Sequence, residues 1–406
     1  MKKTAVIFLI ISAAEIFSYP FVIPYFDEEF FLYPYLNYDQ SFEWKKTREG
    51  HLYEGGLVQT SHGSLTTWML MSNEEAVINR DIGDDFTFRF RYRKYVNRHL
   101  SYDEQSTSAG FGYRISKNLS LMTETELSSE KSEIDLKPGL LYKFQTVSAY
   151  LGLSFTDILF DIKNIGDGKN NTVPLTFSTD IRFSFSRLYF FISGNYATGI
   201  DRTWTANYYT DKLSLKNHNR NLYARIEYDL NDYLKIYSEN YYDDFYNETV
   251  LKDTLSDISA YKFTAKQSVN RIGSIICAGE KNVFDIGFGY AVTDHDFDLI
   301  DGQALTNGHA QSYTIEYPAL LPYIIYKYRF NEKFTAETAY MGSYTVNVPD
   351  DNYYYTKLGE KYWNKELLKL GLEYRFLPNA SLYISAGQLI NTGVFGGGNA
   401  RFNLFF

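Results

Sequence analysis

Residues 222–230 read Leu-Tyr-Ala-Arg-Ile-Glu-Tyr-Asp-Leu, and this stretch decides the fold that we expect. Apolar residues occupy every second position: Leu222, Ala224, Ile226, Tyr228 and Leu230. Three of the four residues between them are charged: Arg225, Glu227 and Asp229. Because successive side chains of a β-strand point to opposite faces, the segment predicts a strand with one apolar face and one charged face.

The same alternation recurs at residues 86–93 and 368–376. In a soluble sheet the apolar face must pack against a second layer, and no stretch here has the pattern of a covering helix. The repeated pattern therefore predicts strands whose apolar face meets lipid and whose charged face surrounds water.

The overall composition agrees with many polar and aromatic strands. Aromatic residues make up 18% of the 406 residues, while the mean hydropathy is −0.32. So many aromatic residues exclude a disordered chain. A bundle of transmembrane helices is excluded too, because each helix needs about 20 consecutive apolar residues, and the one sustained run lies at residues 5–14.

The turns between the predicted strands fall into two classes that alternate along the chain. The short ones lie at residues 116–118, 145–146, 186–187, 231–232, 279–281, 331–332 and 378–379. The long ones lie at residues 166–173, 199–219, 246–261, 294–312 and 346–364. This asymmetry is typical of a transmembrane antiparallel up-and-down β-barrel, with short periplasmic turns and long extracellular loops.

Counting from Phe86 predicts about 16 strands in a barrel at residues 86–406. A misplaced turn would reduce the count to 14. Residues 19–85 form a separate N-terminal segment, which either adds a hairpin and raises the count to 18 or plugs the lumen. We expect it to be partly inserted in the lumen.

The N-terminus has the features of a secretory signal peptide at residues 1–18. Lys2 and Lys3 precede the short apolar run, and Ser18 offers a small residue near the cleavage site. Cys277 is the single cysteine, so an internal disulfide is excluded and the exported chain must be stabilised in other ways.

The last eight residues, Asn399 to Phe406, alternate so that Ala400, Phe402, Leu404 and Phe406 share one face. This end resembles the C-terminal signal of bacterial outer-membrane β-barrel proteins. The resemblance implies a location in the cell outer membrane and two partners, its lipid and the barrel-assembly machinery. The strand count and loop layout also resemble those of general diffusion porins, which implies a possible homotrimer and small hydrophilic solutes as partners.

The charged face predicts the chemistry of the lumen. Basic residues on strands near the barrel closure are expected to form one wall: Arg89, Arg91, Arg93, Arg114, Lys369, Arg375 and Arg401. Acidic residues are expected further round: Glu124, Glu126, Glu227, Asp229 and Glu239. Such a separation would create a field across the lumen. The alternative is that these charges pair across neighbouring strands.

Three other functions find little support in the sequence. His62-Gly63-Ser64 places an imidazole near a hydroxyl, but hydrolysis also needs an orienting group and an oxyanion site, so we expect no enzyme. Asp294, Asp296 and Asp298 could gather around a cation in a loop, but the stretch departs from the EF-hand pattern. A net charge of −9 argues against nucleic-acid binding, and no cofactor motif is present.

The sequence thus predicts a porin-like channel for passive diffusion of small polar or anionic solutes. The alternative is a non-conducting surface protein, an adhesin or receptor, that acts through its extracellular loops.

Overall fold

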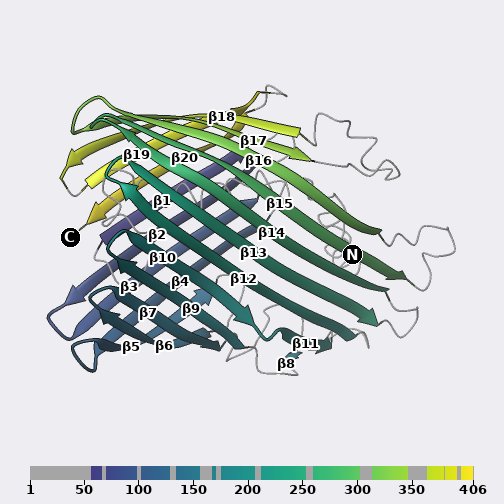
Figure 1. Ribbon diagram of the computed structural model, residues 1–406. Coiled ribbons are helices and arrows are strands. Elements are labelled where there is room, and N and C mark those ends of the chain that lie inside the picture. Colours follow the sequence, from purple (N-terminus) through teal and green to yellow (C-terminus); the bar gives the residue numbers. More distant parts are fainter. Residues whose placement is uncertain are drawn as a thin grey trace.

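The computed structural model describes residues 56–65, 70–97, 102–128, 134–155, 167–170, 175–205, 212–252, 259–301, 313–345, 364–378, 380–390 and 395–405 (Figure 1). These residues form twenty strands: β1 (Gly56–Leu65), β2 (Leu70–Ile82), β3 (Phe86–Asn97), β4 (Tyr102–Arg114), β5 (Leu119–Ser128), β6 (Ile134–Phe144), β7 (Val147–Phe155), β8 (Asp167–Asn170), β9 (Leu175–Phe185), β10 (Leu188–Ala197), β11 (Ile200–Thr205), β12 (Lys212–Asn231), β13 (Leu234–Lys252), β14 (Ser259–Ala278), β15 (Asn282–Asp301), β16 (Tyr313–Arg329), β17 (Phe334–Thr345), β18 (Asn364–Leu377), β19 (Ala380–Leu389) and β20 (Phe395–Phe405). Within these ranges there is no helix of the length and apolarity needed to cross a membrane.

Every strand pairs antiparallel with its neighbours, and the pairing returns to its starting point. β1 pairs with β2 on one side and with β20 on the other. β8 and β11 are not needed to close this circuit, since β7 pairs directly with β9 and β10 with β12. They pair with each other, and β11 also pairs with the first residues of β12. Eighteen of the twenty strands in the described residues therefore form the circuit.

The expected all-β, up-and-down architecture is confirmed, and the strand count lies at the upper end of the expected range. The difference from 16 is the β1–β2 hairpin, which the sequence left open as an extra hairpin or a plug. The backbone of residues 56–82 belongs to the sheet. The signal peptide at residues 1–18, the rest of the N-terminal segment to residue 55, and Phe406 lie outside the described residues.

The short turns lie where the alternation predicts them, and they gather at the left of Figure 1. Each joins two paired strands, as between β14 and β15, where Gly279 adopts a φ of +73° that side chains rarely allow. The long connections differ from expectation, because strand structure extends into them. β12 begins at Lys212, β13 continues to Lys252 and β15 to Asp301.

The apolar side chains lie on the outside of the sheet and the charged ones on the inside. On β12, Ile226 is 46% exposed and its neighbour Arg225 is 5% exposed. On β18, Leu370 is 59% exposed and Lys369 is 3% exposed. A soluble protein shows the opposite distribution. We call the exposed apolar side chains of the outer face the belt.

The belt ends at a row of charged residues. Arg220, Asp244, Lys266 and Asp294 are consecutive register partners across β12 to β15. They share the outward parity of Leu222, and we call them the charged row. About 36 Å of strand separates Arg220 from the turn at Asn231, which at a tilt of about 45° spans roughly the 25 Å height of a lipid-facing band.

This boundary generates a prediction about labelling in lipid vesicles. In a Cys277→Ser background, Ile226→Cys should resist a water-soluble maleimide, because residue 226 contacts lipid. Lys216→Cys, on the same face beyond the charged row, should react completely. Mass spectrometry of the labelled protein measures both, and equal labelling of the two positions would contradict the assignment of the belt.

Candidate functional site

The inner face of β12 to β14 carries a buried network of ion pairs. Arg225 Nη1 lies 2.9 Å from Glu239 Oε2, and Arg271 Nη1 lies 3.4 Å from Glu239 Oε1. Arg225 Nε also contacts Glu227 Oε1 at 2.5 Å. The Tyr223 hydroxyl donates to Glu239 Oε2 at 2.9 Å. The register explains the pattern, because Arg225, Glu239 and Arg271 lie directly opposite one another on three adjacent strands.

The network continues toward the short turns. Lys235 Nζ lies 3.4 Å from Glu227 Oε2 and 3.3 Å from Asp229 Oδ1. Three of the acidic residues expected in the lumen thus have arginine or lysine partners on the same wall: Glu227, Asp229 and Glu239.

Two tyrosines lie flat against the wall beside this network. Tyr237 and Tyr323 are separated in the register by Gly273 and Gly287. A Cβ atom at either glycine would collide with a tyrosine hydroxyl, so the two glycines make room for the rings. The Tyr237 and Tyr323 hydroxyls contact each other, and Tyr237 also donates to Asp285 Oδ1 at 2.7 Å.

The guanidinium groups cover these rings. Arg225 lies 4.3 Å from the centroid of Tyr237, and Arg271 lies 5.8 Å from that of Tyr323. Such cation–π contacts stabilise both partners where water is excluded. The inner wall from β12 to β16 is therefore one laterally packed layer of charges and rings.

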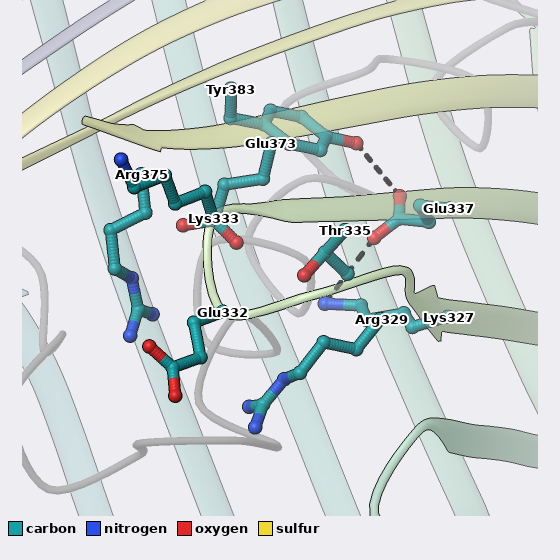
Figure 2. A pocket seen from close by; sticks show the side chains of 9 residues that line it. All are labelled: Lys327, Arg329, Glu332, Lys333, Thr335, Glu337, Glu373, Arg375 and Tyr383. Atoms are coloured by element: carbon teal, nitrogen blue, oxygen red, sulfur yellow. Dashed lines mark hydrogen bonds and ion pairs between the residues drawn. The ribbon is translucent and has the colours of Figure 1, made fainter.

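A second cluster lies near the short turns, on β16 to β19 (Figure 2). It surrounds a recess lined by Lys327, Arg329, Glu332, Lys333, Thr335, Glu337, Glu373, Arg375 and Tyr383. Lys327 Nζ lies 3.3 Å from Glu337 Oε2, and the Tyr383 hydroxyl donates to Glu337 Oε1 at 2.7 Å. Two residues of the expected basic wall belong to this region: Arg375 lines the recess, and Lys369 Nζ lies 5.8 Å from the Tyr383 ring centroid.

The register interleaves the two signs of charge that the sequence assigned to separate regions. Arg89 is opposite Gly110, which is opposite Glu124 on β5. One row further along, Arg91 is opposite Ser108 and then Glu126. Arg93 is opposite Glu75. Glu126 in turn contacts Lys137. For these residues, the basic wall, the separate acidic region and the alternative of paired charges all stay predictions.

The remaining sequence-predicted residues lie in three places. Arg114 ends β4 and is exposed. Arg401 lies on β20 between Tyr383 and Thr60 in the register. Phe402 and Leu404 of the expected assembly signal also lie on β20, the strand that pairs with β1.

The aspartates that were considered for a metal lie on a strand rather than in a loop. Asp294, Asp296 and Asp298 belong to β15. Their register partners on β14 are Lys266, Thr264 and Lys262. On β16, Asp294 is opposite Glu316 and Asp296 is opposite Thr314. In the described part of the chain, no group of three metal-ligating side chains is found. The expected loop at these positions is therefore wrong, because the ladder with β14 continues to Asp301.

Beyond the belt, the charged row is accompanied by a histidine. His218 Nε2 lies 3.5 Å from Asp244 Oδ2, and Arg220 Nη1 lies 3.6 Å from the same oxygen. Desolvation and the Arg220 charge lower the pKa of His218 and outweigh the opposing effect of Asp244. Burial and the neighbouring Glu248 raise the pKa of Tyr246 to about 12. His218 and Tyr246 therefore favour their neutral forms.

Sequence reasoning missed Arg271, Asp285, Lys327 and Glu337. All four have the inward parity of their strands, so the alternation rule applied to residues 271–277, 283–289 and 321–327 would have found three of them. Their partners follow from the register, which short sequence patterns do not reveal.

Neither a protein family model nor a curated protein sequence matches this chain. Solved structures do resemble it. The alcaligin outer-membrane receptor FauA from Bordetella pertussis matches at 11% identity and a TM-score of 0.42, covering 82% of this chain and 51% of its own, so the chain spans about half the length of that protein. The translocator domain of the autotransporter NalP from Neisseria meningitidis matches at 10% identity and a TM-score of 0.35, covering 93% of this chain and 95% of its own. A loop-deletion form of the outer-membrane protein OmpT of Vibrio cholerae matches at 11% identity and a TM-score of 0.35, covering 87% of this chain and 100% of its own.

The chain's own architecture is that of a transmembrane β-barrel of the outer-membrane type. A circuit of antiparallel strands surrounds charged side chains and carries an apolar belt that ends at the charged row. The expected fold class and outer-membrane location are confirmed.

The buried network predicts a sharp difference in stability between two acidic residues. Glu239→Gln should lower the free energy of unfolding by about 3–5 kcal/mol, because it leaves two arginines without their carboxylate in a buried site. Glu248→Gln should lower it by less than about 1 kcal/mol, because the Lys216–Glu248 pair is partly exposed. Urea unfolding in lipid vesicles measures both, and a loss at Glu239 no larger than at Glu248 would contradict the buried network.

Proposed function

We propose that the protein is an outer-membrane channel for the passive diffusion of small polar solutes, anions among them. The observation that carries the proposal is the charged inner face. Arg225, Glu239, Arg271, Lys327 and Lys369 are all on the lumen side of a sheet whose other side is apolar. Charged side chains on the inside of a transmembrane barrel are typical of a lumen that admits water and polar solutes.

The lateral packing of these charges also suits a channel. Ion pairs and cation–π contacts hold the side chains against the wall, along the strands, so that they line a passage with fixed charges. Fixed charges beside low-dielectric walls act on passing ions over several ångströms. Because both signs alternate along the rows, we expect only a moderate preference between anions and cations.

The three arginines of β3 are the best candidates for the anion preference. Arg89, Arg91 and Arg93 occupy alternate positions of a single strand, all of one parity. In the register of the sheet they align with Glu124, Glu126 and Glu75 on nearby strands. The net charge of this part of the wall therefore depends on the arginines.

A second function has one observation in its favour. β12 to β15 are 19 or 20 residues long, and they continue beyond the charged row that ends the belt. A wall that projects past the membrane could present a surface to a partner outside the cell. This supports the non-conducting adhesin or receptor as the alternative. Enzymatic activity is no part of either proposal.

Planar-bilayer recordings of the purified, refolded protein test the channel. We expect discrete conductance steps. The triple variant Arg89→Gln/Arg91→Gln/Arg93→Gln should lower the ratio of chloride to potassium permeability about two- to fivefold, since three charges leave the wall while Glu124 and Glu126 stay.

The matched control removes the same charge from the outer face, with Lys216→Gln/Arg220→Gln/Lys266→Gln. Its permeability ratio should equal that of the unmodified protein. Membranes that stay silent with correctly folded protein would refute the channel and favour the surface protein.

A further inference from the structure

We propose that the outer face of β13 and β14 is the contact surface for a second copy of this chain, and that two copies form a two-fold pair inside the membrane. The surface is a polar patch within the belt, which we call the amide patch. Its members are five outward residues: Ser238, Asn240, Ser268, Asn270 and Ser274. The inference concerns assembly, so it does not depend on the proposed channel.

The register places the two asparagines side by side on the outside of the barrel. Asn240 on β13 is the register partner of Asn270 on β14, and both side chains are exposed. Each shares the parity of an exposed apolar residue on its own strand, Ile236 on β13 and Ile272 on β14. Two neighbouring amides therefore face outward among the apolar side chains of the belt.

The amide patch lies well inside the height of the belt. Asn240 is opposite Ala224 on β12. Ala224 lies four residues from Arg220 of the charged row and seven residues from the turn at Asn231. At about 3.3 Å per residue and a tilt of about 45°, the amides lie roughly 9 Å from the level of the charged row and roughly 16 Å from that of the turn. Lipid at this depth offers no hydrogen-bond partner.

The amides have hydrogen-bonding groups that one copy of the chain does not use. Asn270 Nδ2 donates to Ser268 Oγ at 3.4 Å. Among the described residues, Asn240 has no side-chain hydrogen bond. An asparagine amide offers two N–H donors and an acceptor oxygen, and a polar group in an apolar medium is costly unless it is hydrogen-bonded. The amide patch therefore needs a partner that supplies polar groups, which lipid chains cannot do.

A second copy of the same surface meets this need. An amide both donates and accepts, so identical asparagines can pair with each other across a two-fold axis. In such a pair the same patch lies on both sides of the contact, whereas a closed ring of three copies needs two different, complementary surfaces. One compact patch on two adjacent strands thus favours a pair over the homotrimer that the porin resemblance implies.

The shape of the amide patch also suits close approach of two barrels. Ala224 and Ser238 are small side chains on neighbouring strands, and Ile272, the register partner of Ser238, is 64% exposed. A projecting side chain beside small ones can fill the matching depression of a two-fold partner. Contacts between helices in membranes use small residues for close approach and serine or asparagine for hydrogen bonds. The same physical reasons apply to two barrel walls.

Cysteine cross-linking in membranes of cells that produce the full chain locates the contact. In a Cys277→Ser background, Asn240→Cys should form a disulfide-linked dimer in high yield when copper phenanthroline, an oxidant that enters lipid, is added. Leu370→Cys, at an exposed belt position on β18, is the matched control and should stay largely monomeric. Non-reducing gel electrophoresis and mass spectrometry measure both products.

Energy transfer between two fluorescently labelled populations of the refolded full chain in lipid vesicles measures the strength of the pair. The double variant Asn240→Leu/Asn270→Leu should raise the dissociation constant about ten- to hundredfold, because it removes the amides and leaves an apolar surface that lipid accepts. Thr338→Leu makes a similar polar-to-apolar exchange at an exposed position of β17, opposite Leu370, and should leave the dissociation constant unchanged.

The outcomes are distinct from those that test the channel. A monomer in vesicles, or cross-links at residue 370 as frequent as those at residue 240, would overturn the pair whether or not bilayers show current. A trimer without the 240–240 disulfide would overturn it too, as would a disulfide from residue 240 to a different protein only. A 240–240 disulfide together with weaker association of the leucine variant supports the amide patch as the contact surface.

Discussion

The structure depends on a requirement of the membrane, that each backbone N–H and C=O group within lipid has a partner in the protein itself. Water cannot supply that partner there, and each unsatisfied group costs several kcal/mol. A sheet meets the requirement only if its first and last strands pair. β1 pairs with β20 over eight register positions, from Gly56–Phe405 to Gly63–Gly398. The belt and the inward charges both presuppose this pairing.

Closure of the sheet into a barrel places alternate residues of each strand in two different environments, lipid on the outside and the lumen on the inside. The outward positions that contact lipid must be apolar over the height of the belt, and the inward positions are then free to be charged. The inward charges in turn specify the register, because Arg225, Glu239 and Arg271 contact one another only when β12, β13 and β14 are correctly aligned. The packing of Tyr237 and Tyr323 also specifies the register, since their rings fit only over Gly273 and Gly287. Charge and packing thus limit the slippage to which alternating strands are prone.

Period-two alternation is a local property, and it was enough to predict the strands, the short turns and the face of each residue. Arg225 and Glu227 are inward as expected from their neighbours Ile226 and Tyr228. The pattern could not predict which strands lie opposite one another residue by residue. The register, for example, places Gly110 opposite both Arg89 and Glu124, which no local pattern indicates. It also could not predict that β15 continues through Asp294, because charged outward residues there look like a loop when the facing Lys266 is unknown.

The most direct test of closure is a disulfide between the first and last strands. In a Cys277→Ser background, Thr60→Cys with Arg401→Cys places two thiols on register partners of β1 and β20. Thr60→Cys with Glu75→Cys does the same for β1 and β2 and serves as the reference. Non-reducing mass spectrometry of protein assembled in membranes should find both cross-links in high yield. A cross-link between residues 60 and 75 without one between residues 60 and 401 would show that the ring is open at β1, and would contradict the account.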